Sequence, residues 1–236
     1  MSKSTICVLI PLHNMAQYLF RAVASAVWQL APGDEIIVVD DGSTDLAGYG
    51  EVECFSKRIQ WLRNPVRKGV SYSRNRAIQQ AKAEWIKFLD SDDVLAPYAL
   101  QSLRGAEGRL APEVTVYTGG CHRMYEGQYH DFMCGADESL PQIMNYNPIL
   151  LSASFVRREA LLAVGLFDER IEFEEDWDLW LRLHERFGPS TFLETKDPIC
   201  YYWFVPAERE AKIRSPTVDG IPVREYFRRR YGANPL

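Results

Sequence analysis

Hydrophobic positions in the first half of the chain follow two alternating patterns. Continuous apolar runs that are rich in β-branched residues predict buried parallel strands, because both faces of such strands are covered. Apolar residues that recur at three- and four-residue steps predict amphipathic helices between them. The strands are expected at Thr5 to Ile10, Glu35 to Val39, Ile59 to Leu62 and Trp85 to Leu89, and the helices at Gln17 to Leu30, Ser71 to Ala83 and Pro97 to Leu110. This order favours an α/β fold with a mostly parallel central sheet and right-handed crossovers.

The pattern changes after Pro112. Short strands are expected at Val114 to Thr118, Arg123 to Tyr129, Phe192 to Glu194 and Ile199 to Phe204, and helices at Arg157 to Val164 and Asp176 to Phe187. The segment from His130 to Asn147 carries turn-forming residues without a clear period, which predicts a long loop. Loops of that length in a compact domain are often functional.

Composition and charge exclude several classes of protein. Hydrophobic residues make up 47% of the 236 residues and charged residues 25%, as in a globular protein and unlike a disordered scaffold. The net charge of −5 gives no general basic field, so nucleic acid is not expected as a partner. Basic residues do gather at Arg224 and at Arg228 to Arg230. They form either a solvated helix face or a patch for peripheral contact with a membrane or an anionic acceptor.

The five cysteines are scattered, odd in number and without a CxxC pair. Together with the absence of a signal peptide, this pattern predicts reduced thiols and a cytoplasmic protein, with possible peripheral contact at the inner face of a membrane. Two cysteines and two histidines fall within a short stretch, at Cys121, His122, His130 and Cys134. Their spacing matches no closed zinc site, so this stretch is expected to shape an acceptor pocket instead.

Two acidic clusters directly follow apolar runs. Asp40 and Asp41 follow one strand, and Asp90, Asp92 and Asp93 follow another. The carboxyl ends of parallel strands line the ligand crevice of an open α/β sheet, so the clusters are expected to meet there. Two carboxylate clusters at one edge repel each other unless a cation or hydrogen-bond donors lie between them. Mg²⁺ or Mn²⁺ would serve, because these ions prefer oxygen ligands. Capping of the following helices is the alternative role for these aspartates.

The motifs in their order resemble the family-2 glycosyltransferases of the GT-A fold, over roughly Ile6 to Leu183. The opening VLIPLHN is similar to that family's first strand and nucleotide-contacting turn, and EIIVVDDGSTD to its second-strand signature. Asn64, Gly69 and the sequence SRN resemble the family's next loop and helix. The sequence FLDSDD resembles its DxD motif. The sequence VGLFDE, followed by EDWDLWLR, resembles its acceptor-side ED motif. The resemblance implies one GT-A domain over residues 1–236. Residues 1–110 would bind the nucleotide sugar, and residues 111–236 the acceptor and the catalytic base.

The resemblance also implies roles for single residues. Nucleotide-sugar contacts fall on Pro11, Leu12, His13, Asn14, Asp41, Arg74, Asp90 and Ser91, and metal ligation on Asp92 with Asp90. Asp41 would accept a hydrogen bond from a uracil-like ring, and Arg74 would approach the diphosphate. The implied cofactor is Mn²⁺ or Mg²⁺, and Asp93 is either part of the site or a helix cap.

Sugar transfer needs a base near the acceptor hydroxyl while the nucleoside diphosphate leaves. Asp176 matches the family's base, and Glu175 is the second candidate. A single base opposite the leaving group implies inversion at the anomeric carbon. The acidic residues from Glu172 to Asp178 can also be explained as a helix start that the helix dipole stabilises. Trp177 and Trp180 are expected in the core, with a sugar-stacking wall as the alternative.

One stretch departs from the family's pattern. Where many relatives have Tyr-Arg-x-His after the last strand, this chain reads YYWFVP from Tyr201 to Pro206. Lys212 or Arg214 is the expected replacement at the phosphates.

The expected function is transfer of one sugar from a nucleotide-sugar donor, UDP-linked by preference, during surface-glycan or polysaccharide assembly. The acceptor class stays open between a glycan, a lipid-linked sugar, a protein and a small molecule. A sugar-1-phosphate nucleotidyltransferase and a dinucleotide oxidoreductase are disfavoured because no glycine-rich loop follows a strand. A nucleotide-sugar-binding protein without turnover is the non-enzymatic alternative, and only the departure at Tyr201 to Pro206 favours it.

Overall fold

The computed structural model describes residues 4–45, 49–106, 110–125, 128–132, 143, 147, 149–203 and 217–232. Its strands are β1 (Ile6–Leu12), β2 (Glu35–Asp41), β3 (Gln60–Asn64), β4 (Trp85–Phe88), β5 (Val94–Leu95), β6 (Val116–Tyr125), β7 (Gln128–Phe132), β8 (Ser154–Arg157), β9 (Phe192–Trp203), β10 (Thr217–Val218) and β11 (Ile221–Pro222). Its α-helices are α1 (Ala16–Val27), α2 (Tyr49–Val52), α3 (Val70–Gln80), α4 (Ala99–Ala106), α5 (Arg158–Ala163), α6 (Glu175–Phe187) and α8 (Val223–Tyr231). Short 3-10 helices are η1 (Glu53–Arg58), η3 (Leu151–Ala153) and η4 (Pro189–Thr191).

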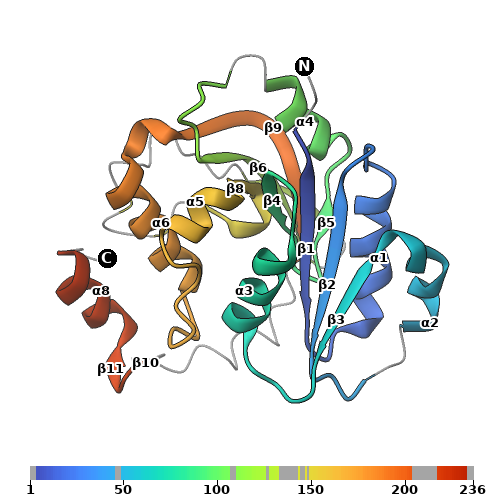
Figure 1. Ribbon diagram of the computed structural model, residues 1–236, viewed down its shortest axis with the longest axis horizontal. Helices are drawn as coiled ribbons and strands as arrows, with labels where there is room; N and C mark the ends of the chain where they lie inside the picture. The colour runs from blue at the N-terminus through green and yellow to red at the C-terminus, as the bar shows by residue number, and fades with distance from the viewer. Residues whose placement is uncertain are drawn as a thin grey trace.

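One large sheet organises the fold. Its strand order is β3-β2-β1-β4-β8-β6-β9-β5, and β7 pairs with β6 outside this path. The first four strands in this order are mutually parallel, which confirms the predicted α/β class (Figure 1). Because these strands run in one direction, the segments that follow β1, β2 and β4 emerge at the same edge. The described part of the chain contains no helix that is both long and apolar enough to cross a membrane.

Helices cover both faces of the sheet. Alternate residues of a strand point to opposite faces, and β1 divides accordingly. Cys7 and Leu9 pack with α3, α5 and α6, whereas Ile6, Val8 and Ile10 pack with α1 and α4. Figure 1 shows α1 and α3 on opposite sides of β1. The continuous apolar run therefore serves two cores.

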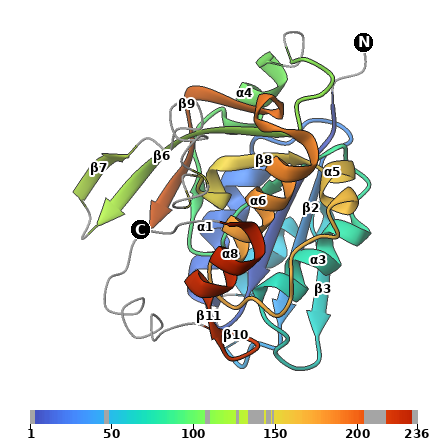
Figure 2. The ribbon, with the colours of Figure 1, turned by 90° about the vertical axis from the view of Figure 1, so that its left-hand side faces the viewer.

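The acceptor-side half differs in detail from the sequence prediction. Strands β6 and β7 form a hairpin that projects with β9 from the body of the protein (Figure 2). The expected strand at Arg123 to Tyr129 is divided between the end of β6 and the start of β7, and the expected loop from His130 begins inside β7. The two short strands expected after Thr191 are one strand, β9, which pairs with β6 at both of its ends, with register shifts between them. Strand β8 was not predicted, since four residues carry too little pattern.

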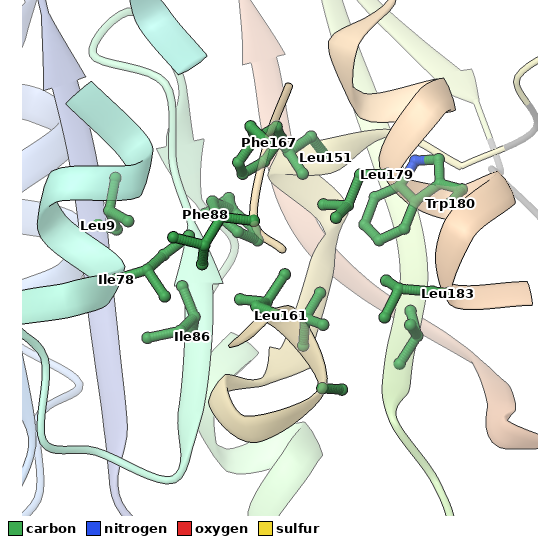
Figure 3. Packing of buried hydrophobic residues seen from close by; sticks show 14 of the residues in the cluster. Leu9, Ile78, Ile86, Phe88, Leu151, Leu161, Phe167, Leu179, Trp180 and Leu183 are labelled. Carbon is green, nitrogen blue, oxygen red and sulfur yellow. The ribbon is translucent and has the colours of Figure 1, made fainter. Parts of the chain in front are cut away.

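The tryptophans of α6 lie in the core, as expected. Trp180 is fully buried in the same apolar cluster as Phe167, and its ring lies beside Leu179 (Figure 3). Trp177 is also buried, and its ring meets that of Phe227 from α8 edge-on at 4.7 Å between centroids. Burial of Trp177 and Trp180 removes the alternative of a sugar-stacking wall.

The basic residues at the end of α8 lie mostly in solvent. Arg228 and Arg229 are exposed, and both form ion pairs with Glu225 on the same helix. Phe227 points instead to the core, where it is fully buried. This arrangement favours the solvated helix face over a free cationic patch.

Candidate functional site

The turns after β1 and β2 lock together at the carboxyl edge of the sheet. His13 Nδ1 lies 2.8 Å from the backbone oxygen of Asp41, and the backbone N–H of Asn14 donates to Ser43 Oγ at 3.0 Å. The side-chain oxygen of Asn14 accepts from the N–H of Thr44 at 2.8 Å. The residues expected to meet the nucleotide, from Pro11 to Asn14, therefore lie directly beside Asp41.

The carboxylate of Asp41 organises the loop before α3. It accepts hydrogen bonds from Asn64 Nδ2 at 2.7 Å and from the N–H groups of Lys68 and Gly69, both at 2.8 Å. These three donors occupy most of the roughly four acceptor positions of a carboxylate. The side chain is only 4% exposed, so little of the carboxylate is accessible to a nucleobase. The contact of Asp41 with a nucleobase stays a prediction.

Gly42 is required by the backbone that follows Asp41. Its φ is +65°, a left-handed value that favours glycine. A Cβ at this position would lie 2.7 Å from the backbone of Val66 and Arg67. The DDG sequence is thus what allows the loop around residues 64–69 to approach the carboxylates.

Arg74 links the two acidic motifs of the site. Its guanidinium lies 2.9 Å from Asp90 Oδ1 and 2.6 Å from Glu175 Oε1, and it stands over the ring of Phe167. The arginine is 4% exposed, and the two carboxylates hold its pKa above the ordinary value. Sequence reasoning placed Arg74 at the diphosphate, but two of its donor groups are already engaged by these carboxylates. Its contact with a diphosphate stays a prediction.

The carboxylate turn after β4 has an accessible and a buried part. Asp90 and Asp92 are half-buried, with a third of the Asp90 side chain exposed, whereas Ser91 and Asp93 are buried. Among the described residues, no three His, Cys, Asp or Glu side chains form a ready-made metal cage. Mg²⁺ and Mn²⁺ often bind through one or two carboxylates and substrate phosphates, and accessible Asp90 and Asp92 fit that mode.

Asp176 stands at the start of α6, next to the anchored Glu175. Its Oδ1 accepts a hydrogen bond from the N–H of Trp177 at 2.9 Å. Burial and the neighbouring charge of Glu175 raise the pKa of Asp176 from 3.8 to about 7, against the opposing effect of Arg74. A carboxylate with a pKa near neutrality suits a general base. Glu175, by contrast, is held in an ion pair.

Lys87 was not predicted as a functional residue. It lies in the middle of β4, is fully buried, and donates to the backbone oxygens of Phe88, at 2.6 Å, and Ser152. Burial lowers the pKa of this lysine to about 8. The hydroxyl of Ser152 accepts from the N–H of Asp90. A lysine inside an otherwise apolar strand is the sequence feature that could have identified this buried charge.

The cysteine and histidine stretch is only partly described. Cys121 and Cys200 are opposite each other on β6 and β9, with 3.2 Å between their sulfur atoms, and His122 stacks on Tyr201. Burial raises the pKa of the Cys200 thiol. Cys134 and the side chain of His130 lie outside the described residues, so the expectations about zinc and an acceptor pocket stay untested. The same holds for Lys212 and Arg214.

Comparison with known proteins agrees with this fold. The model of the glycosyl transferase family 2 matches residues 7–139, more than half of the chain. The chain therefore belongs to glycosyl transferase family 2, and its sheet has the GT-A architecture.

Individual relatives are distant. An uncharacterized glycosyltransferase of Rickettsia prowazekii is 26% identical over 192 residues, covering 75% of this chain and 58% of the relative. The structure of S. aureus TarS 1-349 with UDP-GlcNAc matches with a TM-score of 0.72 at 19% identity, over 89% of this chain and 61% of TarS 1-349. Mannosyltransferase PcManGT from Pyrobaculum calidifontis, in complex with GDP-Man and Mn²⁺, matches with a TM-score of 0.67 at 15% identity, over 90% of this chain and 60% of that protein.

Proposed function

We propose that the chain is an inverting, metal-dependent glycosyltransferase that moves one sugar from a nucleoside-diphosphate sugar to an acceptor hydroxyl. The observation that carries this proposal is the Arg74 bridge. It joins the carboxylate turn of Asp90 to the start of α6, where Asp176 has a pKa near neutrality. One site thus combines groups for a metal-bound diphosphate with a poised base.

The donor side is formed by residues 1–110. We assign nucleotide contacts to the turn from Pro11 to Asn14 and metal ligation to Asp92 with Asp90. A bound Mg²⁺ or Mn²⁺ would offset the charge that builds up on the departing diphosphate. UDP-GlcNAc in the TarS complex and GDP-Man in the PcManGT complex both support a nucleoside diphosphate sugar as donor. We favour the uridine nucleotide and a role in surface-glycan assembly.

The acceptor side is formed by residues 111–236. Asp176 removes the proton of the acceptor hydroxyl as its oxygen attacks the anomeric carbon, from the face opposite the diphosphate. Glu175 does not compete for this role, because Arg74 lies 2.6 Å from its carboxylate. Attack opposite the leaving group inverts the anomeric configuration.

The rate of transfer is expected to increase with pH around neutrality. Asp176 must be ionised to act as a base, and its pKa is about 7, so kcat/KM should rise through pH 7 and level off above pH 8. Measurement of kcat/KM from about pH 5.5 to 9 checks this. A profile that is flat across neutrality would contradict the assignment of the base.

Stability should depend on pH in the opposite sense. Folding raises the pKa of Asp176 from 3.8 to about 7, so the folded state favours the protonated form. Its contribution to stability is complete below pH 3.8 and is lost as the pH rises through 7. Urea unfolding measures the free energy of unfolding of wild type and of Asp176→Asn at several pH values. Between pH 3.8 and 7, wild type should lose stability relative to the variant. A difference in free energy that does not change with pH would contradict the raised pKa.

A further inference from the structure

Helix α8 follows the last of the family motifs and lies beyond the residues that the family model matches. It packs on the first turn of α6, which begins at Glu175 and carries Asp176 (Figure 2). Three side chains of α8 reach this turn, and they are Phe227, Arg230 and Tyr231. The helix that carries the base therefore has a second helix docked at its start.

The carboxylate of Asp178 is shared between the two helices. Its Oδ1 accepts a hydrogen bond from the hydroxyl of Tyr231 at 2.5 Å and lies 3.4 Å from Arg230 Nη1, both on α8. Its Oδ2 lies 2.6 Å from Arg182 on α6 itself. Burial and the negative charge of Asp178 raise the pKa of Tyr231, so the hydroxyl keeps its proton and donates. Because Asp178 is fully buried, its charge depends on these partners.

Trp177 forms the second contact between the two helices. Its buried ring meets the ring of Phe227 edge-on, with 4.7 Å between the centroids. The backbone N–H of Trp177 is also the donor to Asp176 Oδ1 at 2.9 Å. Helix α8 thus contacts the residue whose backbone holds the carboxylate of the base.

The first turn of α6 is consequently anchored from two sides. From α3, Arg74 pairs with Glu175 at 2.6 Å. From α8, the partners described above hold Trp177 and Asp178. Asp176 lies between these anchored residues in the chain. A general base acts only within hydrogen-bond reach of the proton that it removes, so the position of this turn matters for transfer.

We propose that Tyr231 is a positioning residue for the base. Through Asp178, its hydroxyl holds the first turn of α6 so that the carboxylate of Asp176 lies beside the acceptor hydroxyl. This inference rests on the proposed function, because it takes Asp176 as the base.

Tyr231→Phe tests the proposal, because it removes the hydroxyl and keeps the ring. The probe is UDP-GlcNAc with Mn²⁺, with water in place of the acceptor. The water oxygen attacks the anomeric carbon, the base takes a proton, and UDP leaves and is measured. GDP-Man replaces UDP-GlcNAc if GDP is the nucleotide that binds. We expect kcat to fall about tenfold with KM for the donor unchanged, since a displaced base slows the reaction without touching the donor turns.

Tyr226→Phe is the matched control. It removes a hydroxyl from the same helix, but this hydroxyl contacts Arg170 and Arg230, and kcat should stay at the wild-type value. Thermal unfolding shows that both variants are folded at the assay temperature, so a loss of stability alone does not lower kcat. A wild-type kcat in Tyr231→Phe, or an equal loss in Tyr226→Phe, would overturn the role of Tyr231.

Failure of the proposed function would give a different result in the same assay. Wild type would release no nucleoside diphosphate, or Asp176→Asn would release it as fast as wild type. If Asp176→Asn is inactive and Tyr231→Phe is fully active, the proposed function stands and only the positioning role is lost.

Discussion

Asp176→Asn should lower kcat of sugar transfer about 100- to 10,000-fold while nucleotide binding is retained. The substitution keeps the size of the side chain and removes the oxygen that takes the acceptor proton. KM for the donor should change little, because Asp176 lies at the start of α6 and not on the turns around Asp41. Steady-state kinetics with the donor that binds, together with calorimetry of nucleotide binding, measure both quantities.

Glu175→Gln is the matched control for this prediction. It sits one position away, is also isosteric, and removes a carboxylate from the same helix turn. Because Glu175 is paired with Arg74, its loss should affect positioning and lower kcat less than Asp176→Asn. A larger loss of kcat in Glu175→Gln than in Asp176→Asn would exchange the roles of the two residues.

Arg74→Met should destabilise the protein by about 2 to 3 kcal/mol. The arginine is 4% exposed and compensates Glu175 and Asp90, so its removal leaves two carboxylates without their cation. The expected loss lies at or below the lower end of the range for buried pairs, because Asp90 is a third exposed and therefore partly solvated. Urea unfolding at neutral pH measures the free energy of unfolding.

A double-mutant cycle attributes this loss to the bridge. Glu175→Gln should cost less in the Arg74→Met background than in wild type, since the ion pair is already absent there. Arg74→Lys keeps the charge but lacks the fork that reaches two carboxylates, and an intermediate stability is expected. Additive effects of Arg74→Met and Glu175→Gln would show that the two side chains do not stabilise each other.

The sequence predicted the parallel half of the fold because its strands carry long apolar runs and end in recognisable polar turns. The clusters at Asp40 and at Asp90 were placed at one edge of the sheet by strand direction alone. The side chains that pair with these residues could not be predicted from the sequence. Arg74 pairs with Glu175 101 positions away, and only the packed positions of α3 and α6 bring them together.

The acceptor-side half was harder to predict for a physical reason. Short strands such as β8 gain their stability from neighbouring strands, so four residues carry little pattern of their own. Lys87 can be recognised in the sequence as a charged residue within an apolar strand. Its partner, a backbone oxygen of η3, cannot be predicted, because every residue carries the same backbone groups.

Calorimetry of nucleotide binding tests the central claim most directly. UDP, GDP, dTDP and CMP are titrated into wild type and Asp92→Ala, each with and without Mn²⁺. We predict that one nucleoside diphosphate, UDP by preference, binds wild type in a Mn²⁺-dependent manner and that Asp92→Ala loses the metal-dependent part. Absence of binding by any of the four nucleotides under either condition would contradict a nucleotide-sugar-dependent transferase.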